Sequence, residues 1–151
     1  MYEFLRWQVR DVMSKPVTIP PTTSLGEAQR LFEQYGFDVF PVVDASERLL
    51  GVVSSLDLLA AFTFTPEVTL PPYSKLMMEP VSRVMSREVS TVTPRTPLTR
   101  VLERLVRERR KSLPVVDDDR VVGVVAREDL MTALRRAEQD GELPGPPAAS
   151  G

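Results

Sequence analysis

The sequence predicts a protein of the α/β class, of the α+β type, made of two β-α-β-β-α repeats packed with pseudo-two-fold symmetry. The first observation is repetition, because three short motifs occur twice in the same order. The second is patterning, because β-branched apolar segments alternate in each copy with segments of helical apolar spacing. The third is size: each copy has about 50 residues, too few to bury an adequate core alone, so the copies should pack on each other.

The repeated motifs are separated by 72 or 73 residues. They are VMSKPV (12–17) and VMSREV (84–89), FPVVD (40–44) and LPVVD (113–117), and GVVSSLDL (51–58) and GVVAREDL (123–130). Three motifs in one order are not expected by chance. They predict a first repeat over residues 9–62, a linker over 63–80, a second repeat over 81–137 and a tail over 138–151.

In the first copy, residues 17–20 are expected to be extended, and Thr23 or Ser24 can cap the helix that follows. The apolar residues of this helix recur at helical spacing; they are Leu25, Ala28, Leu31, Phe32 and Tyr35. Two strands rich in valine follow, over residues 38–44 and 49–54, with a polar turn between them. A closing helix covers residues 55–62.

The second copy has the same order, beginning with an extended segment at residues 89–92. Thr96 is expected to cap the next helix, with Pro97 at the first helical position. The apolar stripe of this helix contains Leu98, Val101, Leu102, Leu105 and Val106. Strands over residues 112–117 and 121–126 and a helix over 127–139 complete the copy. The aspartates at 117–119 lack the ligand spread of a calcium loop and predict a polar turn.

Two segments lie outside this pattern. The linker contains four prolines and is long for a loop in a compact domain, although YSKLMM (73–78) can form a helical turn. The tail is rich in proline, glycine and alanine from Asp140 onward, and we expect it to be disordered.

The composition limits the functions open to the chain. A net charge of −2 argues against a nucleic-acid surface. No apolar run approaches the roughly 20 residues that span a bilayer, and the N-terminus lacks a signal-peptide core, so we expect a cytoplasmic protein with no membrane partner. There is no cysteine and no histidine, which excludes disulfides, zinc fingers and Ser-His-Asp triads. We therefore expect no catalytic residues and no metal site. The absence of asparagine suits a heat-adapted source, whereas the excess of arginine over lysine could equally reflect a GC-rich genome.

The repeated motifs resemble a tandem pair of cystathionine β-synthase (CBS) domains, known as a Bateman module. The resemblance rests on Val12-Met13-Ser14, on the Pro41–Asp44 strand and on Gly51-Val52-Val53-Ser54-x-x-Asp57, each with its partner in the second copy. It covers roughly residues 9 to 137. It implies a homodimer that binds adenine nucleotides or related ligands between the repeats and regulates another protein. Since the chain leaves no room for a catalytic domain, it looks like a stand-alone module.

The Ser54-x-x-Asp57 stretch has two interpretations. It resembles a capping box, in which the serine accepts from the helix backbone and the aspartate lies in the positive first turn. It could also hold a ligand, because a carboxylate can accept two hydrogen bonds from a ribose diol and the serine can donate to a ribose or phosphate oxygen. In the second copy, Ala126 replaces the serine and Asp129 alone completes no capping box. We favour ligand binding at Asp57 and leave both interpretations open at Asp129.

The family geometry implies two composite sites, each formed by the Ser/Asp corner of one repeat and the first strands of the other. One site would contain Ser54, Asp57, Ser90, Thr91, Lys111 and Leu113. The other would contain Asp129, Arg127, Thr18, Ile19, Phe37, Val39 and Phe40. Lys111 and Arg127 are the candidate phosphate partners, and Asp38 adds an unfavourable negative charge to the second site.

Some of these residues also have a purely structural interpretation. Phe40 is expected to be a core residue rather than a base-stacking platform, and Phe37 could be either. The basic run from Arg104 to Lys111 is interrupted by Glu108 and is interpreted as a solvated helix face with a cationic C-terminal turn, not as a nucleic-acid site.

We therefore predict a non-enzymatic sensor that requires no cofactor and binds AMP, ADP or ATP as its ligand. The alternatives are a sensor of S-adenosylmethionine and a structural interaction module with vestigial sites. The apolar segments LLAAF (58–62) and LMTAL (130–134), together with the N-terminal YEFLRW (2–7), predict a self-contact in a homodimer. The regulated partner protein is not specified by the sequence.

Overall fold

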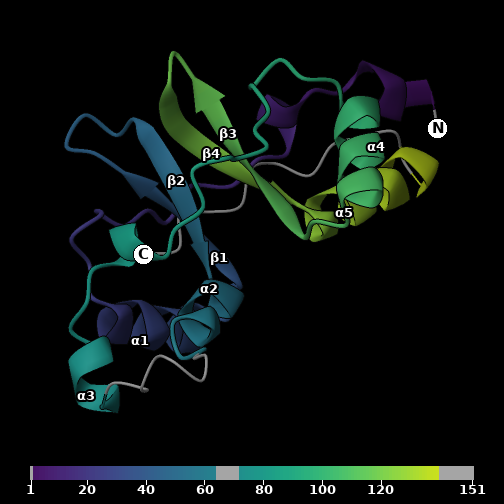
Figure 1. The fold of residues 1–151 in the computed structure, drawn as a ribbon. Helices are drawn as coiled ribbons and strands as arrows, with labels where there is room; N and C mark the ends of the chain where they lie inside the picture. The colour runs from purple at the N-terminus through teal and green to yellow at the C-terminus, as the bar shows by residue number, and fades with distance from the viewer. Residues whose placement is uncertain (1, 64–71, 140–151) are drawn as a thin grey trace. The chain divides into compact units, whose positions relative to one another are not determined.

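The computed structural model describes residues 2–63 and 72–139 (Figure 1). The chain divides into two compact units that do not follow the order of the sequence. One unit combines Met1–Pro16 with Ser90–Gly151, and the other is Val17–Val89. We call them the C-terminal unit and the N-terminal unit, and each is described by itself. The mixture of helices and strands confirms the predicted α+β class.

The N-terminal unit is built around the hairpin of β1 (Val39–Val43) and β2 (Leu49–Ser54). Helix α1 (Leu25–Tyr35) precedes the hairpin and α2 (Ser55–Ala60) follows it. The short helix α3 (Tyr73–Leu76) and the 3-10 turn η3 (Val81–Arg83) come after residues 64–71, which lie outside the description. The helical turn predicted within residues 73–78 is therefore confirmed.

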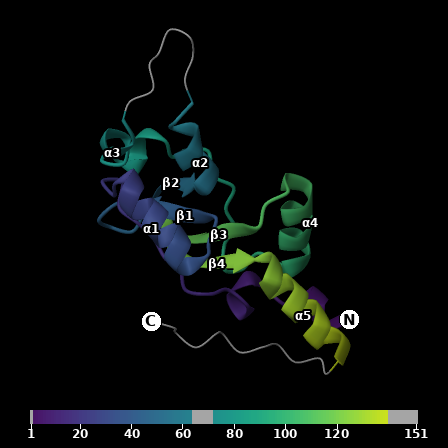
Figure 2. The same ribbon diagram turned by 90° about the horizontal axis from the view of Figure 1, so that it is seen from below.

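The C-terminal unit has the same plan, with the hairpin of β3 (Ser112–Asp117) and β4 (Arg120–Ala126). Helices α4 (Leu98–Glu108) and α5 (Arg127–Gln139) flank the hairpin in sequence, and both views show its two strands side by side (Figure 2). The 3-10 turns η1 (Tyr2–Arg6) and η2 (Val9–Asp11) belong to this unit. The tail predicted from Asp140 onward lies outside the described residues.

Both edges of each hairpin carry one further backbone bridge. In the N-terminal unit, Ile19 pairs in parallel with Val42 of β1, and Ser86 pairs antiparallel with Val52 of β2. In the C-terminal unit, the equivalent bridges are Val92 to Val115 and Ser14 to Val124. The extended segments predicted at 17–20 and 89–92 thus lie against the strands of their own copy. The VMS segments instead pair with the hairpin of the other copy.

The pairing of each VMS segment with the hairpin of the other copy explains the glycine of each GVV motif. We call this pairing the exchange of the VMS segments. A Cβ atom built on Gly51 would lie 2.5 Å from the carbonyl oxygen of Ser86. A Cβ atom on Gly123 would lie 2.8 Å from the sulfur of Met13 and 3.1 Å from the carbonyl oxygen of Ser14. The VMS and GVV motifs therefore occur together in the repeat because their backbones approach too closely for a side chain.

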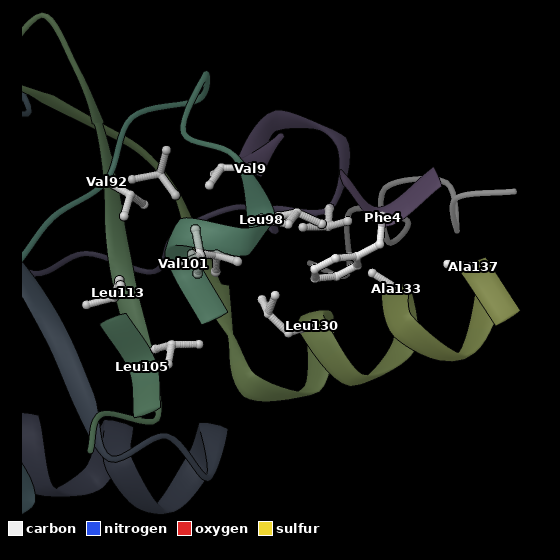
Figure 3. Close-up of a cluster of buried hydrophobic side chains, with 13 residues drawn as sticks. Phe4, Val9, Val92, Leu98, Val101, Leu105, Leu113, Leu130, Ala133 and Ala137 are labelled. Atoms are coloured by element: carbon white, nitrogen blue, oxygen red, sulfur yellow. The ribbon is translucent and has the colours of Figure 1, made fainter. Parts of the chain in front are cut away.

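Each unit has its own buried apolar cluster. In the N-terminal unit the cluster includes Phe32 of α1, Phe40 of β1 and Val81 of η3. In the C-terminal unit, Phe4 from η1 lies beside Leu98 of α4 and Ala133 of α5, and Val9 extends the cluster (Figure 3). The N-terminal segment is thus part of the core that the second copy builds, and the prediction that YEFLRW serves a self-contact is wrong for Phe4, which is buried within the unit.

The starts of the equivalent helices α1 and α4 differ from each other. Ser24 is the N-cap of α1, because its hydroxyl oxygen accepts from the backbone N–H of Glu27 at 3.1 Å. Of the two predicted caps, Thr23 and Ser24, the second is therefore confirmed. The prediction for α4 is wrong: Pro97 is the N-cap, and the Thr96 hydroxyl instead accepts from the N–H of Thr93 at 3.0 Å. The first N–H of α4 donates to the carbonyl of Trp7 at 3.0 Å, so the N-terminal segment replaces the expected side-chain cap.

Candidate functional site

The corner between β2 and α2 holds Ser54 and Asp57 in a complete capping box. The Ser54 hydroxyl accepts from the backbone N–H of Asp57 at 3.1 Å, and Asp57 Oδ2 accepts from the N–H of Ser54 at 2.8 Å. Both side chains are half-buried. Among the described residues no side chain or backbone donor reaches Oδ1 of Asp57, so this oxygen remains able to accept a further hydrogen bond.

The corner between β4 and α5 keeps one half of this arrangement. Asp129 Oδ2 accepts from the backbone N–H of Ala126 at 2.7 Å, while the alanine offers no hydroxyl in return. Burial raises the pKa of the Asp129 carboxyl, and the nearby charge of Glu128 adds to this, whereas the hydrogen bond from Ala126 lowers the pKa. A further hydrogen-bond donor at this carboxylate would stabilise its charged form, as the N–H of Ala126 does.

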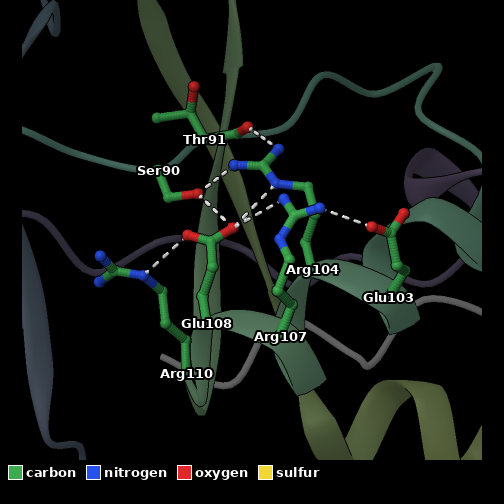
Figure 4. Close-up of polar contacts among 7 residues, drawn as sticks. All are labelled: Ser90, Thr91, Glu103, Arg104, Arg107, Glu108 and Arg110. Carbon is green, nitrogen blue, oxygen red and sulfur yellow. Dashed lines mark hydrogen bonds and ion pairs between the residues drawn. The ribbon is translucent and has the colours of Figure 1, made fainter.

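Ser90 and Thr91 lie in the extended segment that pairs with β3, next to helix α4 (Figure 4). The Ser90 hydroxyl donates to Glu108 Oε2 at 3.1 Å and also contacts the guanidinium of Arg104. The carbonyl oxygen of Thr91 accepts from Arg104 Nη1 at 2.5 Å. The Ser90 hydroxyl and the Thr91 carbonyl oxygen are thus already engaged by side chains of α4.

Arg104 and Glu108 contact two predicted site residues but were not themselves predicted. Arg104 was expected on a solvated helix face, yet only 21% of its side chain is exposed. The signal was present: the repeat places Arg104 where the first copy has Leu31, an apolar position of α1, so a charged residue there is unusual. Arg107, which is 63% exposed, does fit the solvated face.

The remaining predicted residues of the C-terminal unit have different surroundings. Leu113 is fully buried in the core cluster and offers only backbone atoms to a ligand. The carbonyl oxygen of Lys111 accepts from the backbone N–H of Arg127 at 2.9 Å. The exposed Arg127 side chain donates through Nε to the carbonyl oxygen of Arg110 at 2.8 Å. Asp117 ends β3 and Arg120 begins β4, so the aspartate run forms the predicted turn.

In the N-terminal unit, the predicted residues divide into core and surface. Ile19 and Phe40 are buried in the core, in agreement with the core interpretation of Phe40, while Thr18 and Val39 are half-buried. Phe37 is 46% exposed and stacks on Tyr35 with ring centroids 5.3 Å apart. This pair presents an aromatic face that could hold a flat ligand ring.

The described part of the chain thus brings together Ser54 with Asp57 and, separately, Ser90 and Thr91 with Arg104 and Glu108. Each of the two composite sites takes residues from both units, and both composite sites stay predictions. Within residues 2–63 and 72–139 there is no cluster of three or more acidic residues that could hold a metal ion. No helix in these ranges has the length and apolar character needed to cross a membrane.

The sequence profile of the CBS domain matches residues 9–63 and 81–136. The chain belongs to the CBS domain family. The match covers both copies, so the chain contains a CBS domain pair, as the resemblance implied.

Solved structures of CBS pairs have the same fold. A candidate acetoin utilization protein (AcuB) of Vibrio cholerae is 33% identical, with a TM-score of 0.76 over 91% of this chain and 98% of that one. CBSX2, solved in complex with AMP, is 27% identical, with a TM-score of 0.75 over 88% of this chain and 99% of that one. The CBS pair of MJ0100, solved with 5-methylthioadenosine and S-adenosyl-L-methionine, is 26% identical, with a TM-score of 0.66 over 88% of this chain and 98% of that one.

CBS pairs also occur as parts of longer proteins. The A-adding tRNA nucleotidyltransferase of Geobacter sulfurreducens is 30% identical over 135 residues, which are 89% of this chain and 14% of that protein. This chain therefore spans only a small part of that curated relative.

Proposed function

We propose that this CBS pair is a regulatory, non-enzymatic module that binds an adenosine-containing ligand, with AMP, ADP or ATP preferred. The observation that carries the proposal is the corner at Asp57: one carboxylate oxygen holds the helix start, and the other has no donor among the described residues. A ribose diol would supply the missing donors. The AMP complex of CBSX2 supports this ligand class.

In this proposal each ligand contacts both CBS domains. Ser54 and Asp57 would act with Ser90, Thr91, Lys111 and the backbone of Leu113. Asp129 and Arg127 would act with Thr18, Val39 and the exposed ring of Phe37. The buried side chains of Ile19 and Phe40 would not contact the ligand but would hold the strands in place from the core. The first set is polar and suits a phosphate, whereas the second contains an aromatic face and suits a base.

Two other functions have specific support. The MJ0100 complex supports S-adenosyl-L-methionine as an alternative ligand. The complete capping box supports a purely structural module, because helix capping alone accounts for both Ser54 and Asp57.

One variant separates ligand binding from capping. In Asp57→Asn, the amide oxygen can still accept from the N–H of Ser54, but the amide nitrogen replaces the acceptor that would hold the ribose. A ligand at about 100 times its dissociation constant adds ~2.7 kcal/mol, which raises the melting temperature of a chain of this size by roughly 5–10 °C. We expect AMP to give this shift in the wild type and a much smaller shift in Asp57→Asn.

The test compares melting temperatures with AMP, ADP, ATP and S-adenosyl-L-methionine, together with mass spectrometry of any nucleotide released from the purified protein. An Asp57→Asn protein that AMP stabilises as strongly as wild type would refute the ribose assignment. If no ligand stabilises the wild type at millimolar concentration, the structural module is favoured.

We also propose a homodimer. Leu56 and Leu59 on α2 and Met131 on α5 are 70%, 67% and 66% exposed, and a self-contact would bury them. Sedimentation velocity at micromolar concentration tests this, and a monomer would contradict it.

A further inference from the structure

The carboxylate of Glu108 faces three guanidinium groups (Figure 4). Glu108 Oε2 lies 3.2 Å from Arg104 Nε and 3.9 Å from Arg107 Nη2, and Oε1 lies 3.3 Å from Arg110 Nε. The Ser90 hydroxyl donates to the same Oε2 at 3.1 Å. One negative group is therefore surrounded by several donors and by more positive charge than it neutralises.

A second carboxylate only partly balances this excess. Glu103 pairs with Arg107 at 2.6 Å, and it is 61% exposed, so solvent screens it. The pKa of Glu108 is lowered, first by the hydrogen bond from Ser90 and then by Arg104 and Arg110, against an opposing effect of burial. Glu108 thus stays ionised as the anion of this cluster.

The fold does not require this charged cluster, because the first copy builds the same framework without it. Helices α1 and α4 both have 11 residues, and each ends at a residue in the left-handed conformation, Gly36 and Arg109. An offset of 73 residues places Ser90, Arg104 and Glu108 where the first copy has Val17, Leu31 and Tyr35. Val17 and Leu31 pack against the apolar core of the N-terminal unit. Two positions that are apolar in the first copy, Val17 and Leu31, are thus polar in the second, as Ser90 and Arg104.

The chemistry of the charged cluster matches that of a phosphate site. A serine hydroxyl and a guanidinium that converge on one anionic oxygen are the donors from which a phosphate oxygen accepts hydrogen bonds. In this structure that oxygen is Oε2 of Glu108.

We propose that Glu108 is an internal counter-anion, which a ligand phosphate displaces from Ser90 and Arg104. The nucleotide nature of the ligand rests on the proposed function, but the exchange of one anion for another does not. The cluster would select ligands that carry phosphate over uncharged nucleosides, and Glu108 would lower the affinity for every such anion.

The test measures binding of inorganic pyrophosphate, AMP and adenosine by calorimetry at constant ionic strength. Glu108→Gln removes the competing charge and keeps a side chain of the same size. Since a charge-assisted hydrogen bond to Arg104 or Ser90 is then released for the ligand, we expect pyrophosphate and AMP to bind about tenfold more tightly and adenosine to be unchanged. The matched control is Glu103→Gln, the same change on the exposed side of α4, and its affinities should stay within about twofold of wild type.

A second variant does not depend on the behaviour of Glu108→Gln. The triple change Ser90→Val, Arg104→Leu and Glu108→Tyr gives the second copy the residues that the first copy carries in the same framework. We expect this protein to fold and to bind pyrophosphate at least about tenfold more weakly than Glu108→Gln.

The outcomes separate this inference from the proposed function. Pyrophosphate binding that is equal in Glu108→Gln and wild type, absent in both, or equally increased in Glu103→Gln overturns the inference. Tighter AMP binding by wild type than by Glu108→Gln also overturns it and leaves the nucleotide sensor standing. A gain in pyrophosphate affinity without any response to AMP or adenosine supports the inference and argues against the nucleotide sensor.

Discussion

At the scale of single residues, the aspartate at the corner after each second strand has the same structural role in both copies. Asp57 holds the start of α2 with one oxygen, and Asp129 makes the same contact at the start of α5 without a serine partner. The acceptor half of the capping box is therefore common to both copies, and only the hydroxyl half differs. This explains how the aspartate is retained where the serine is not.

The capping role predicts stability changes that do not depend on any ligand. Ala126→Ser supplies an acceptor for the N–H of Asp129, and we expect it to raise the free energy of unfolding by about 0.5–1 kcal/mol. Ser54→Ala removes the equivalent acceptor and should lower it by ~1 kcal/mol. Urea unfolding without nucleotide measures both changes. A lower stability of Ala126→Ser would mean that the second corner cannot accommodate the hydroxyl.

At the scale of elements, the sequence predicts what local patterns determine. Helical apolar spacing located α1 and α4, and the β-branched runs located the four hairpin strands within a residue or two. The Thr96 cap was wrong because the partner of the first N–H of α4 is the carbonyl of Trp7, which is distant in sequence. Arg104 was missed for the same reason, since its partners at Ser90 and Thr91 precede α4.

The packing of the VMS segments on the hairpins predicts which of the two motif glycines loses more stability on substitution by alanine. In Gly51→Ala the new methyl group meets a backbone carbonyl oxygen at 2.5 Å, and the backbone can only move away. In Gly123→Ala its nearest neighbour is the flexible side chain of Met13, with the carbonyl oxygen of Ser14 at 3.1 Å. We expect Gly51→Ala to cost about 2–3 kcal/mol and Gly123→Ala about 1 kcal/mol in chemical denaturation. Equal costs, or the reverse order, would contradict this account of the motif.

At the scale of the whole molecule, the repeat is visible in the sequence, but its division into compact units is not. The two VMS motifs begin with the same three residues, as do the two GVV motifs, so sequence alone does not determine which VMS segment pairs with which hairpin. In the structure each VMS segment pairs with the hairpin of the other copy. The predicted composite sites likewise combine residues of both copies, and their membership comes from the family resemblance.

The exchange of the VMS segments predicts which unit is destabilised by a substitution in the segment that opens each repeat. Val9 precedes the first hairpin in sequence but is fully buried in the C-terminal unit, and Val81 opens the second repeat but is fully buried in the N-terminal unit. Removing two methyl groups from either side chain should cost about 1–3 kcal/mol through lost burial and the cavity that remains. We expect Val9→Ala to speed amide hydrogen exchange mainly in β3, β4 and α5, and Val81→Ala to speed it mainly in β1, β2 and α1.

Hydrogen exchange followed by mass spectrometry measures both variants, and each is the control for the other. Local opening raises exchange in the cooperative unit that loses stability, so the two exchange patterns should be complementary. If the units instead followed the sequence repeats, Val9→Ala would loosen β1 and β2, and Val81→Ala would loosen β3 and β4. That reversed pattern would refute the exchange of the VMS segments, and with it the explanation of Gly51 and Gly123.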